Sequence, residues 1–136
     1  MPADEALLAV VSEWIYRAEG DLKNATHVLM LRRQCPTETV AFHAQQCVEK
    51  YIKAALTFYE IEFPKVHDIE KLVRLLPPDA LAVFPVTEQR TLTSTLSQLG
   101  TQAISIRSRL MKRDSPYESR DGFARNFANY FQKRFF

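Results

Sequence analysis

Glycine is scarce in this sequence, and patterns typical of β-strands are scarce as well. The chain of 136 residues has three glycines, no low-complexity tract and no internal repeat. It also lacks any long alternation of apolar and polar residues, which is the pattern of a half-buried strand. Apolar residues recur instead at steps of three and four, the spacing of one helix face. The sequence therefore predicts an all-α fold.

Long apolar runs and cysteines are also few. No apolar run approaches the roughly 20 residues that cross a bilayer, so no membrane partner is expected. The first ten residues, MPADEALLAV, carry acids and lack the basic region of a secretory signal, and we expect a cytoplasmic protein. The two cysteines, Cys35 and Cys47, match no zinc spacing. Cys47 is expected to pack as a small apolar residue, and Cys35 to lie in a loop.

Histidines are too few and too widely spaced to predict a metal site. His27, His43 and His67 are the three in the chain, and no pair of them stands three or four residues apart. The pair His67 and Asp68 fits a residue just outside a helix followed by its N-cap. Phosphate-binding glycine loops and serine or thiol hydrolase motifs are missing as well. We therefore expect neither a metal nor another cofactor.

The helical pattern predicts an up-and-down bundle of four to five helices in a single domain, residues 1–136. Asp4 is expected to cap a long first helix whose apolar stripe is Leu7, Val11, Trp14, Ala18, Leu22, Ala25 and Leu29. Thr37 is expected to cap a second helix that runs to about residue 60, and Asp68 a short third helix that Pro77 and Pro78 stop. Further helices are predicted across 92–110 and 123–131.

Charge is distributed unevenly along a chain whose net charge is only +2. The last thirty residues hold eight basic and three acidic residues, whereas the first 106 hold ten basic and thirteen acidic ones. A basic C-terminal region favours a polyanionic partner, either nucleic acid or nucleotide. The alternative is that these charges form an ordinary solvated face.

The stretch AFHAQQCVEKYIKAAL, residues 41–56, combines a wide apolar side with a narrow polar stripe. Four polar residues share one arc of about 80° when the stretch is wound at about 100° per residue: His43, Gln46, Lys50 and Lys53. Donors and two cations beside an aromatic wall suit a phosphate or a base, so the stripe is a candidate ligand site. The alternative is structural, with Gln46 or Lys50 paired to Glu13 or Glu19.

Three stretches of the sequence together resemble the HEPN domain family. They are WIYRAEGDLKNATHVL, FHAQQCVEKYIKAAL and FPKVHDIEKL, in the order and spacing of the family motifs. The likeness covers about residues 14–76 closely and the remainder only in helical pattern. It implies a bundle of four to five helices, commonly a homodimer, with nucleotide or RNA association. It also implies a small nucleotidyltransferase partner in a toxin–antitoxin arrangement.

The chain departs from the ribonuclease members of that family, which use an Arg followed after four to six residues by a His late in the domain. No Arg here precedes a His at that distance, and no His follows His67. The segment RSRLMKRDSPYE lies where the family keeps this signature, so Arg107, Arg109 and Arg113 are candidate phosphate-binding residues without an acid–base His. We therefore interpret the chain as a non-enzymatic nucleotide- or RNA-binding module. An atypical metal-independent ribonuclease toxin and a purely protein-binding subunit are the alternatives.

Overall fold

The computed structural model describes residues 4–81, and within this range the chain forms helices and no strand. In order, they are α1 (Glu5–Leu29), a short 3₁₀ turn η1 (Arg32–Gln34), α2 (Thr37–Phe58), α3 (Ile69–Arg74) and α4 (Pro78–Leu81). The predicted all-α class is confirmed. The helices expected across 92–110 and 123–131 lie outside the described residues.

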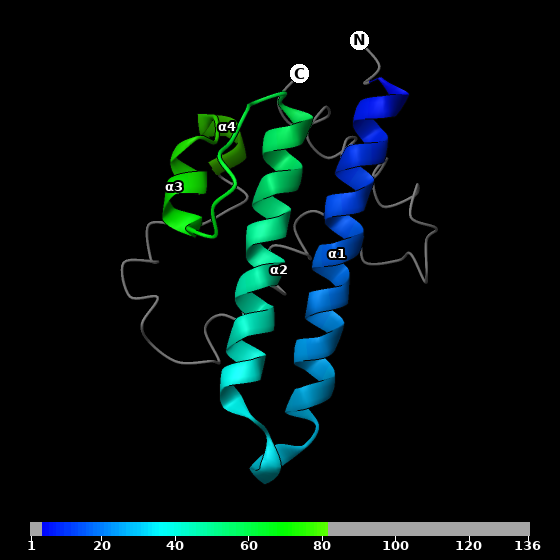
Figure 1. Ribbon diagram of the computed structural model, residues 1–136, viewed down its shortest axis with the longest axis vertical. Coiled ribbons are helices and arrows are strands. Elements are labelled where there is room, and N and C mark those ends of the chain that lie inside the picture. The colour runs from blue at the N-terminus through cyan, green and yellow to red at the C-terminus, as the bar shows by residue number, and fades with distance from the viewer. Residues whose placement is uncertain (1–3, 82–136) are drawn as a thin grey trace.

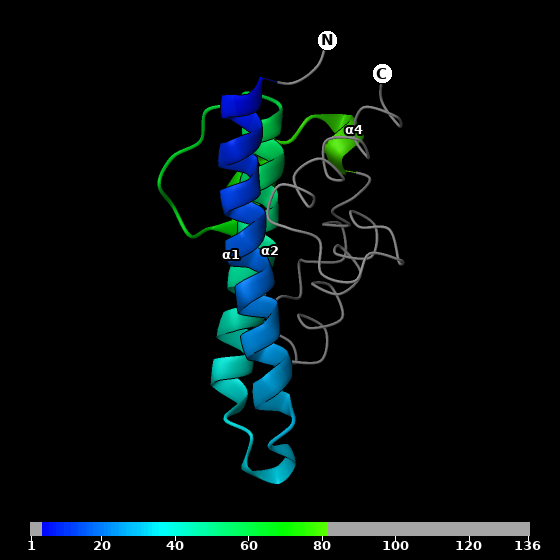
Figure 2. The ribbon, with the colours of Figure 1, turned by 90° about the vertical axis from the view of Figure 1, so that its right-hand side faces the viewer.

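Helices α1 and α2 form an antiparallel hairpin, and they lie side by side along most of their length in two perpendicular views (Figures 1 and 2). The shorter α3 and α4 lie on the half of this hairpin away from the η1 turn. This arrangement gives the expected up-and-down course for the first two helices. It also places the polar residues of α2 next to the middle and C-terminal half of α1.

The core is built around α2, which has apolar residues on more than half of its circumference. Its largest buried side chains pack in one cluster with residues of α1 and α3: Tyr51, Ile52, Leu56, Val11, Ile15 and Leu72. Full burial of one such aliphatic side chain stabilises the fold by about 1.5–3 kcal/mol. Cys47 belongs to this cluster and is fully buried, as predicted for a small apolar residue.

The first helix begins where the sequence predicts. The Asp4 side chain accepts a hydrogen bond from the Ala6 backbone N–H at 3.3 Å, which satisfies one of the free donors of the first turn. The predicted stripe is buried at Val11, Ala18 and Ala25. Leu29 was expected in this stripe but is 53% exposed, because it is the last residue of α1 and the chain turns away directly after it.

The turn between α1 and α2 differs from the prediction in one detail. Pro36, in extended geometry, is the N-cap of α2, and Thr37 is the first helical residue rather than the cap. The N-cap makes no side-chain hydrogen bond, because proline has no side-chain acceptor to offer. Cys35, the last residue before Pro36, is half-buried and a free thiol, in a loop as expected.

Helix α2 ends at Phe58, two residues before the predicted end, for a reason that lies in the backbone. Glu60 adopts a left-handed conformation with φ of 55°. The Ile61 N–H then donates to the Leu56 carbonyl at 2.9 Å and the Glu60 N–H donates to the Thr57 carbonyl at 3.0 Å. These two bonds form a Schellman motif, which satisfies the last carbonyls of a helix and terminates it.

The segment after α2 follows the predicted order of an extended stretch and a short helix. Asp68 caps α3, as predicted, and its side chain accepts from the Lys71 N–H at 3.2 Å. Helix α3 ends at Arg74, before Pro77 and Pro78 as predicted, and a further turn, α4, which was not predicted, starts at Pro78. Proline is well suited to the first position of a helix, where its missing N–H has no partner to lose.

Candidate polar site between α1 and α2

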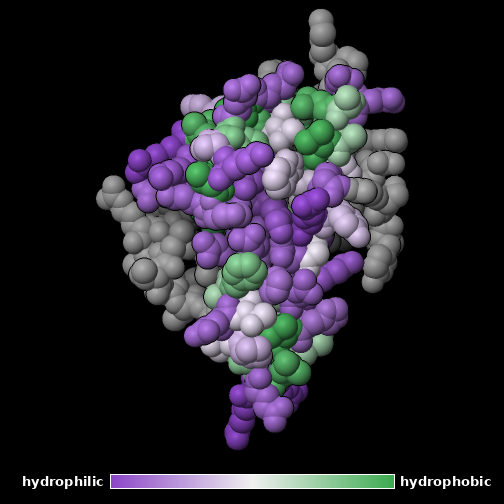
Figure 3. Space-filling model, viewed as in Figure 1, coloured by the Kyte–Doolittle hydropathy of each residue, from purple (hydrophilic) through white to green (hydrophobic). Residues whose placement is uncertain are grey.

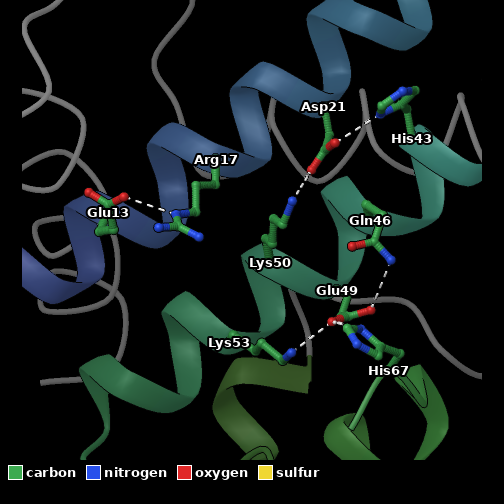
Figure 4. Close-up of polar contacts among 9 residues, drawn as sticks. All are labelled: Glu13, Arg17, Asp21, His43, Gln46, Glu49, Lys50, Lys53 and His67. Atoms are coloured by element: carbon green, nitrogen blue, oxygen red, sulfur yellow. Dashed lines mark hydrogen bonds and ion pairs between the residues drawn. The ribbon is translucent and has the colours of Figure 1, made fainter. Parts of the chain in front are cut away.

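Asp21 of α1 contacts two residues of the candidate stripe (Figure 4). Its Oδ1 lies 2.9 Å from Nδ1 of His43, and its Oδ2 accepts a hydrogen bond from Nζ of Lys50. The carboxylate is almost buried, while the side chains of His43 and Lys50 keep 24% and 21% of their surface exposed. One carboxylate of α1 therefore holds two polar side chains of α2 at the edge of the core.

The helical repeat explains why these three residues meet. His43 and Lys50 are seven residues apart, two turns of helix, and so lie on the same side of α2. Asp21 lies between Ala18 and Ala25 on the buried side of α1, which faces α2. The two alanines are small and fully or almost fully buried, which leaves room for α2 beside the Asp21 carboxylate.

Glu49 is the centre of a second polar cluster, which lies on the opposite side of Gln46 from Asp21 (Figure 4). Its Oε1 lies 2.7 Å from Nζ of Lys53 and 3.1 Å from Nδ1 of His67, and its Oε2 accepts from Nε2 of Gln46 at 3.5 Å, the long limit for such a bond. The side chains of Glu49 and Lys53 are buried, whereas that of His67 is 80% exposed. This cluster ties the segment before α3 to α2.

Lys53 is more deeply placed than a solvated stripe would require. Its ammonium lies 5.4 Å from the centre of the Trp14 ring, a cation–π contact. Trp14 packs edge-on against Phe63, with ring centres 6.2 Å apart. Of the four residues of the candidate stripe, Lys53 is therefore the one that faces the core, because its buried partner Glu49 and the Trp14 ring draw it inward.

The two lysines of the stripe both have carboxylate partners within the chain. Asp21 balances the charge of Lys50, and Glu49 balances that of Lys53. With neutral imidazoles the two clusters carry no net charge. These clusters therefore attract a ligand phosphate more weakly than two unpaired ammonium groups would. Positive charge that attracts the phosphate more strongly must come from elsewhere in the chain.

The acidic partners differ from those expected. The structural alternative paired Gln46 or Lys50 with Glu13 or Glu19, but Glu13 pairs with Arg17 at 2.9 Å and Glu19 accepts a hydrogen bond from Tyr51. Sequence reasoning did not select Asp21 or Glu49. The available signal for Asp21 was its position, three residues after Ala18 and four before Ala25 in the apolar stripe of α1.

The structure brings together part of the predicted site. His43 and Lys50 share one carboxylate, Gln46 and Lys53 share another, and all four lie on α2. Arg107, Arg109 and Arg113 lie outside the described residues. Within residues 4–81, no group of three or more His, Cys, Asp or Glu side chains is placed to hold a metal ion. No helix in this range is long and apolar enough to cross a membrane.

These features define the class of the protein. It is an all-α bundle protein with a polar network along the interface of its first two helices. Comparison with protein-family models matches the HEPN domain over residues 11–115. The chain therefore belongs to the HEPN domain family, as the sequence motifs indicated, and it is a nucleotide- or RNA-related helical module. Comparisons with curated proteins and with solved structures gave no match.

Proposed function

We propose that this chain is a HEPN module that binds a nucleotide or RNA in the cytoplasm and works with a small nucleotidyltransferase protein. Family membership supports the ligand class. The observation that carries the proposal is the pairing of His43 and Lys50 on the single carboxylate of Asp21, with both side chains still partly exposed. Polar groups that are held in position at a surface are suited to a polar ligand.

Among residues 4–81, both side chains retain hydrogen-bonding capacity beyond Asp21. The Lys50 ammonium has three donors and contacts Asp21 with one of them. His43 uses Nδ1 toward Asp21, so its other ring nitrogen is available to a ligand. Phosphate oxygens accept charge-assisted hydrogen bonds from such groups. Lys53 is nearly buried, so we assign it the task of holding Glu49 rather than direct ligand contact.

We assign the electrostatic attraction of phosphate groups to the basic C-terminal region, because the lysines of the Asp21 and Glu49 clusters are already paired with carboxylates. Arg107, Arg109 and Arg113 belong to a segment with an excess of basic residues. Arginine is well suited to phosphate because its planar fork can donate two parallel hydrogen bonds. We therefore propose that these arginines supply the salt-sensitive part of RNA binding and that His43, Gln46 and Lys50 supply a local site.

We also propose that the chain is a homodimer. Three consecutive residues at and directly after the end of α1, Leu29, Met30 and Leu31, expose more than half of their surface. Apolar residues gather near this turn end of the hairpin on the face shown in Figure 3, where most of the middle is polar. Exposed apolar patches of this kind favour association. Light scattering at micromolar concentration tests this, and a strict monomer would contradict it.

Equilibrium binding of a mononucleotide and of a long single-stranded RNA at low salt tests the binding proposal. Lys50→Ala should weaken the mononucleotide more than the RNA, because the long strand keeps its other contacts. Arg17→Ala is the matched control, since Arg17 is an exposed basic residue of α1 that pairs with Glu13. It should change neither affinity appreciably. Failure of the wild-type chain to bind either ligand at low salt would refute the proposal and favour a protein-binding subunit.

An atypical metal-independent ribonuclease toxin is the second candidate. The observation in its favour is the Asp21–His43 contact, because a carboxylate on one imidazole nitrogen orients the ring with its other nitrogen outward. We expect no strong activity, since the sequence lacks the late His after an Arg. Rapid RNA cleavage without metal, abolished by His43→Ala, would favour the toxin instead.

Co-purification of the chain from its native host tests the partner proposal, because it identifies a bound nucleotidyltransferase and any retained nucleotide.

A further inference from the structure

Phe42 is an exposed aromatic residue beside the candidate site. It leaves 57% of its surface exposed, although α2 buries most of its large apolar side chains. Its ring packs edge-on against the imidazole of His43, with ring centres 5.4 Å apart. Because Asp21 holds His43 in turn, the Phe42 ring has a fixed neighbour. A rigid, exposed aromatic surface next to hydrogen-bonding groups is the combination that stacks on a planar ligand.

The helical repeat aligns this ring with two residues of the stripe. Phe42, Gln46 and Lys50 follow one another at four-residue steps, so they succeed each other along one side of α2 at about 6 Å per step. Gln46 carries an amide with both donor and acceptor atoms, and Lys50 carries a partly exposed ammonium. An aromatic face, an amide and a cation in this order match the base and phosphate of one nucleotide.

We propose that Phe42 is the stacking surface for one nucleobase of the ligand, with Gln46 beside the base edge and Lys50 toward the phosphate. This inference rests on the proposed function and names the part of the ligand that the site recognises. A nucleobase is favoured over a second copy of the chain because the groups next to Phe42 are polar. His43, Gln46 and Lys50 suit a ligand with hydrogen-bonding atoms better than an apolar helix face.

The experiment compares two ligands that differ only by the base, adenosine monophosphate and ribose 5-phosphate, on the full chain. Phe42→Leu should weaken adenosine monophosphate by about 5- to 100-fold, the effect of removing one stacked base, and leave ribose 5-phosphate unchanged. Phe42→Trp should retain binding, and its added fluorescence should be quenched by adenosine monophosphate but not by ribose 5-phosphate. Lys50→Ala should weaken both ligands.

Tyr16→Leu is the matched control, because Tyr16 is an aromatic residue of α1 that is 62% exposed. It should leave both affinities unchanged. Unchanged nucleotide affinity in Phe42→Leu, with normal wild-type binding, overturns the stacking proposal alone. An equal loss for both ligands also overturns it and assigns Phe42 a structural role. A Phe42→Leu chain that becomes monomeric in light scattering shows that a second copy covers the ring. If the wild-type chain binds neither adenosine monophosphate nor RNA, both proposals fall; if it binds RNA alone, only the stacking proposal falls.

Discussion

Glu49 and Lys53 form an ion pair that is almost completely shielded from water. Their side chains are 2% and 8% exposed, and Oε1 and Nζ lie 2.7 Å apart. Removing one partner of such a pair leaves a buried charge without compensation, which costs about 3–5 kcal/mol. We therefore expect Glu49→Ala to lower the free energy of unfolding by about 3–5 kcal/mol in urea denaturation.

A second ion pair in the same chain provides the control. Glu70 and Arg74 are also four residues apart on a helix, but their side chains are 70% and 74% exposed. Glu70→Ala should therefore change stability by less than about 1 kcal/mol. A double variant, Glu49→Leu with Lys53→Met, should be more stable than Glu49→Ala, because it leaves no isolated charge in the core. Equal losses in Glu49→Ala and Glu70→Ala would show that burial of the first pair has no energetic consequence.

Gly20 lies in the middle of α1 on its exposed side, and an added Cβ would meet nothing within 4 Å. Alanine has a higher helix propensity than glycine by about 1 kcal/mol. Gly20→Ala should therefore raise the free energy of unfolding by about 0.5–1 kcal/mol. The reverse change at another exposed α1 position, Ala9→Gly, should lower it by a similar amount. A stability loss in Gly20→Ala would mean that glycine serves a contact outside the described residues.

The features of the fold that could be predicted from the sequence are those that depend on residues close together in the chain. Caps at Asp4 and Asp68 follow from side chains that bond their own backbone a few residues on, so they can be read without tertiary information. The end of α2 was misplaced because Glu60, rather than a glycine or an asparagine, takes the left-handed position. The residues around Glu60 do not indicate that it adopts a left-handed conformation.

The candidate site was harder to predict, because its partners come from different helices. The periodicity of α2 grouped His43, Gln46, Lys50 and Lys53, and the structure places them on two carboxylates. Which acid faces which base depends on the rotation and the register of α1 against α2, and these are set by packing of the whole core. Asp21 was therefore missed, although it lies in the sequence motif that indicated the family.

We expect the buried phenol of Tyr59 to make the folded state less stable at alkaline pH. Burial, and then the negative charge of Asp79, raise the pKa of its phenol above the ordinary value of 10.0. The neutral phenol is thus favoured in the folded state, and its stabilising contribution is complete below the ordinary pKa. As pH rises above about 10, the unfolded chain loses this proton first, so the folded state loses stability by up to about 1.4 kcal/mol per pH unit.

The measurement is urea denaturation at about pH 9 and about pH 11, on either side of the ordinary tyrosine pKa. Tyr59→Phe should lose less stability between the two pH values than the wild-type chain does. Tyr16→Phe is the control, because Tyr16 is largely exposed, and it should follow the wild-type chain. If Tyr59→Phe also follows the wild-type chain, ionisation of this phenol does not limit alkaline stability.

The basic C-terminal region predicts how RNA binding depends on salt. Each phosphate contact on a single strand adds about 0.7 to the slope of log affinity against log salt, because the contact releases bound counterions. If Arg109 and Arg113 each contact a phosphate, replacing both with alanine should flatten that slope by roughly one to two units. Fluorescence titration of a single-stranded RNA at several salt concentrations measures the slope directly.

The control must remove the same charge from a part of the chain that is not proposed to touch RNA. Arg17→Ala with Arg74→Ala does so, since each of these arginines is exposed and paired with an acid one turn away on its own helix. This double variant should bind more weakly only through the general field of the protein and should keep a wild-type slope, because no phosphate contact is lost. A slope that flattens equally in both double variants would mean that net charge alone governs binding. A slope that ignores Arg109→Ala and Arg113→Ala would place the phosphate contacts in another part of the chain.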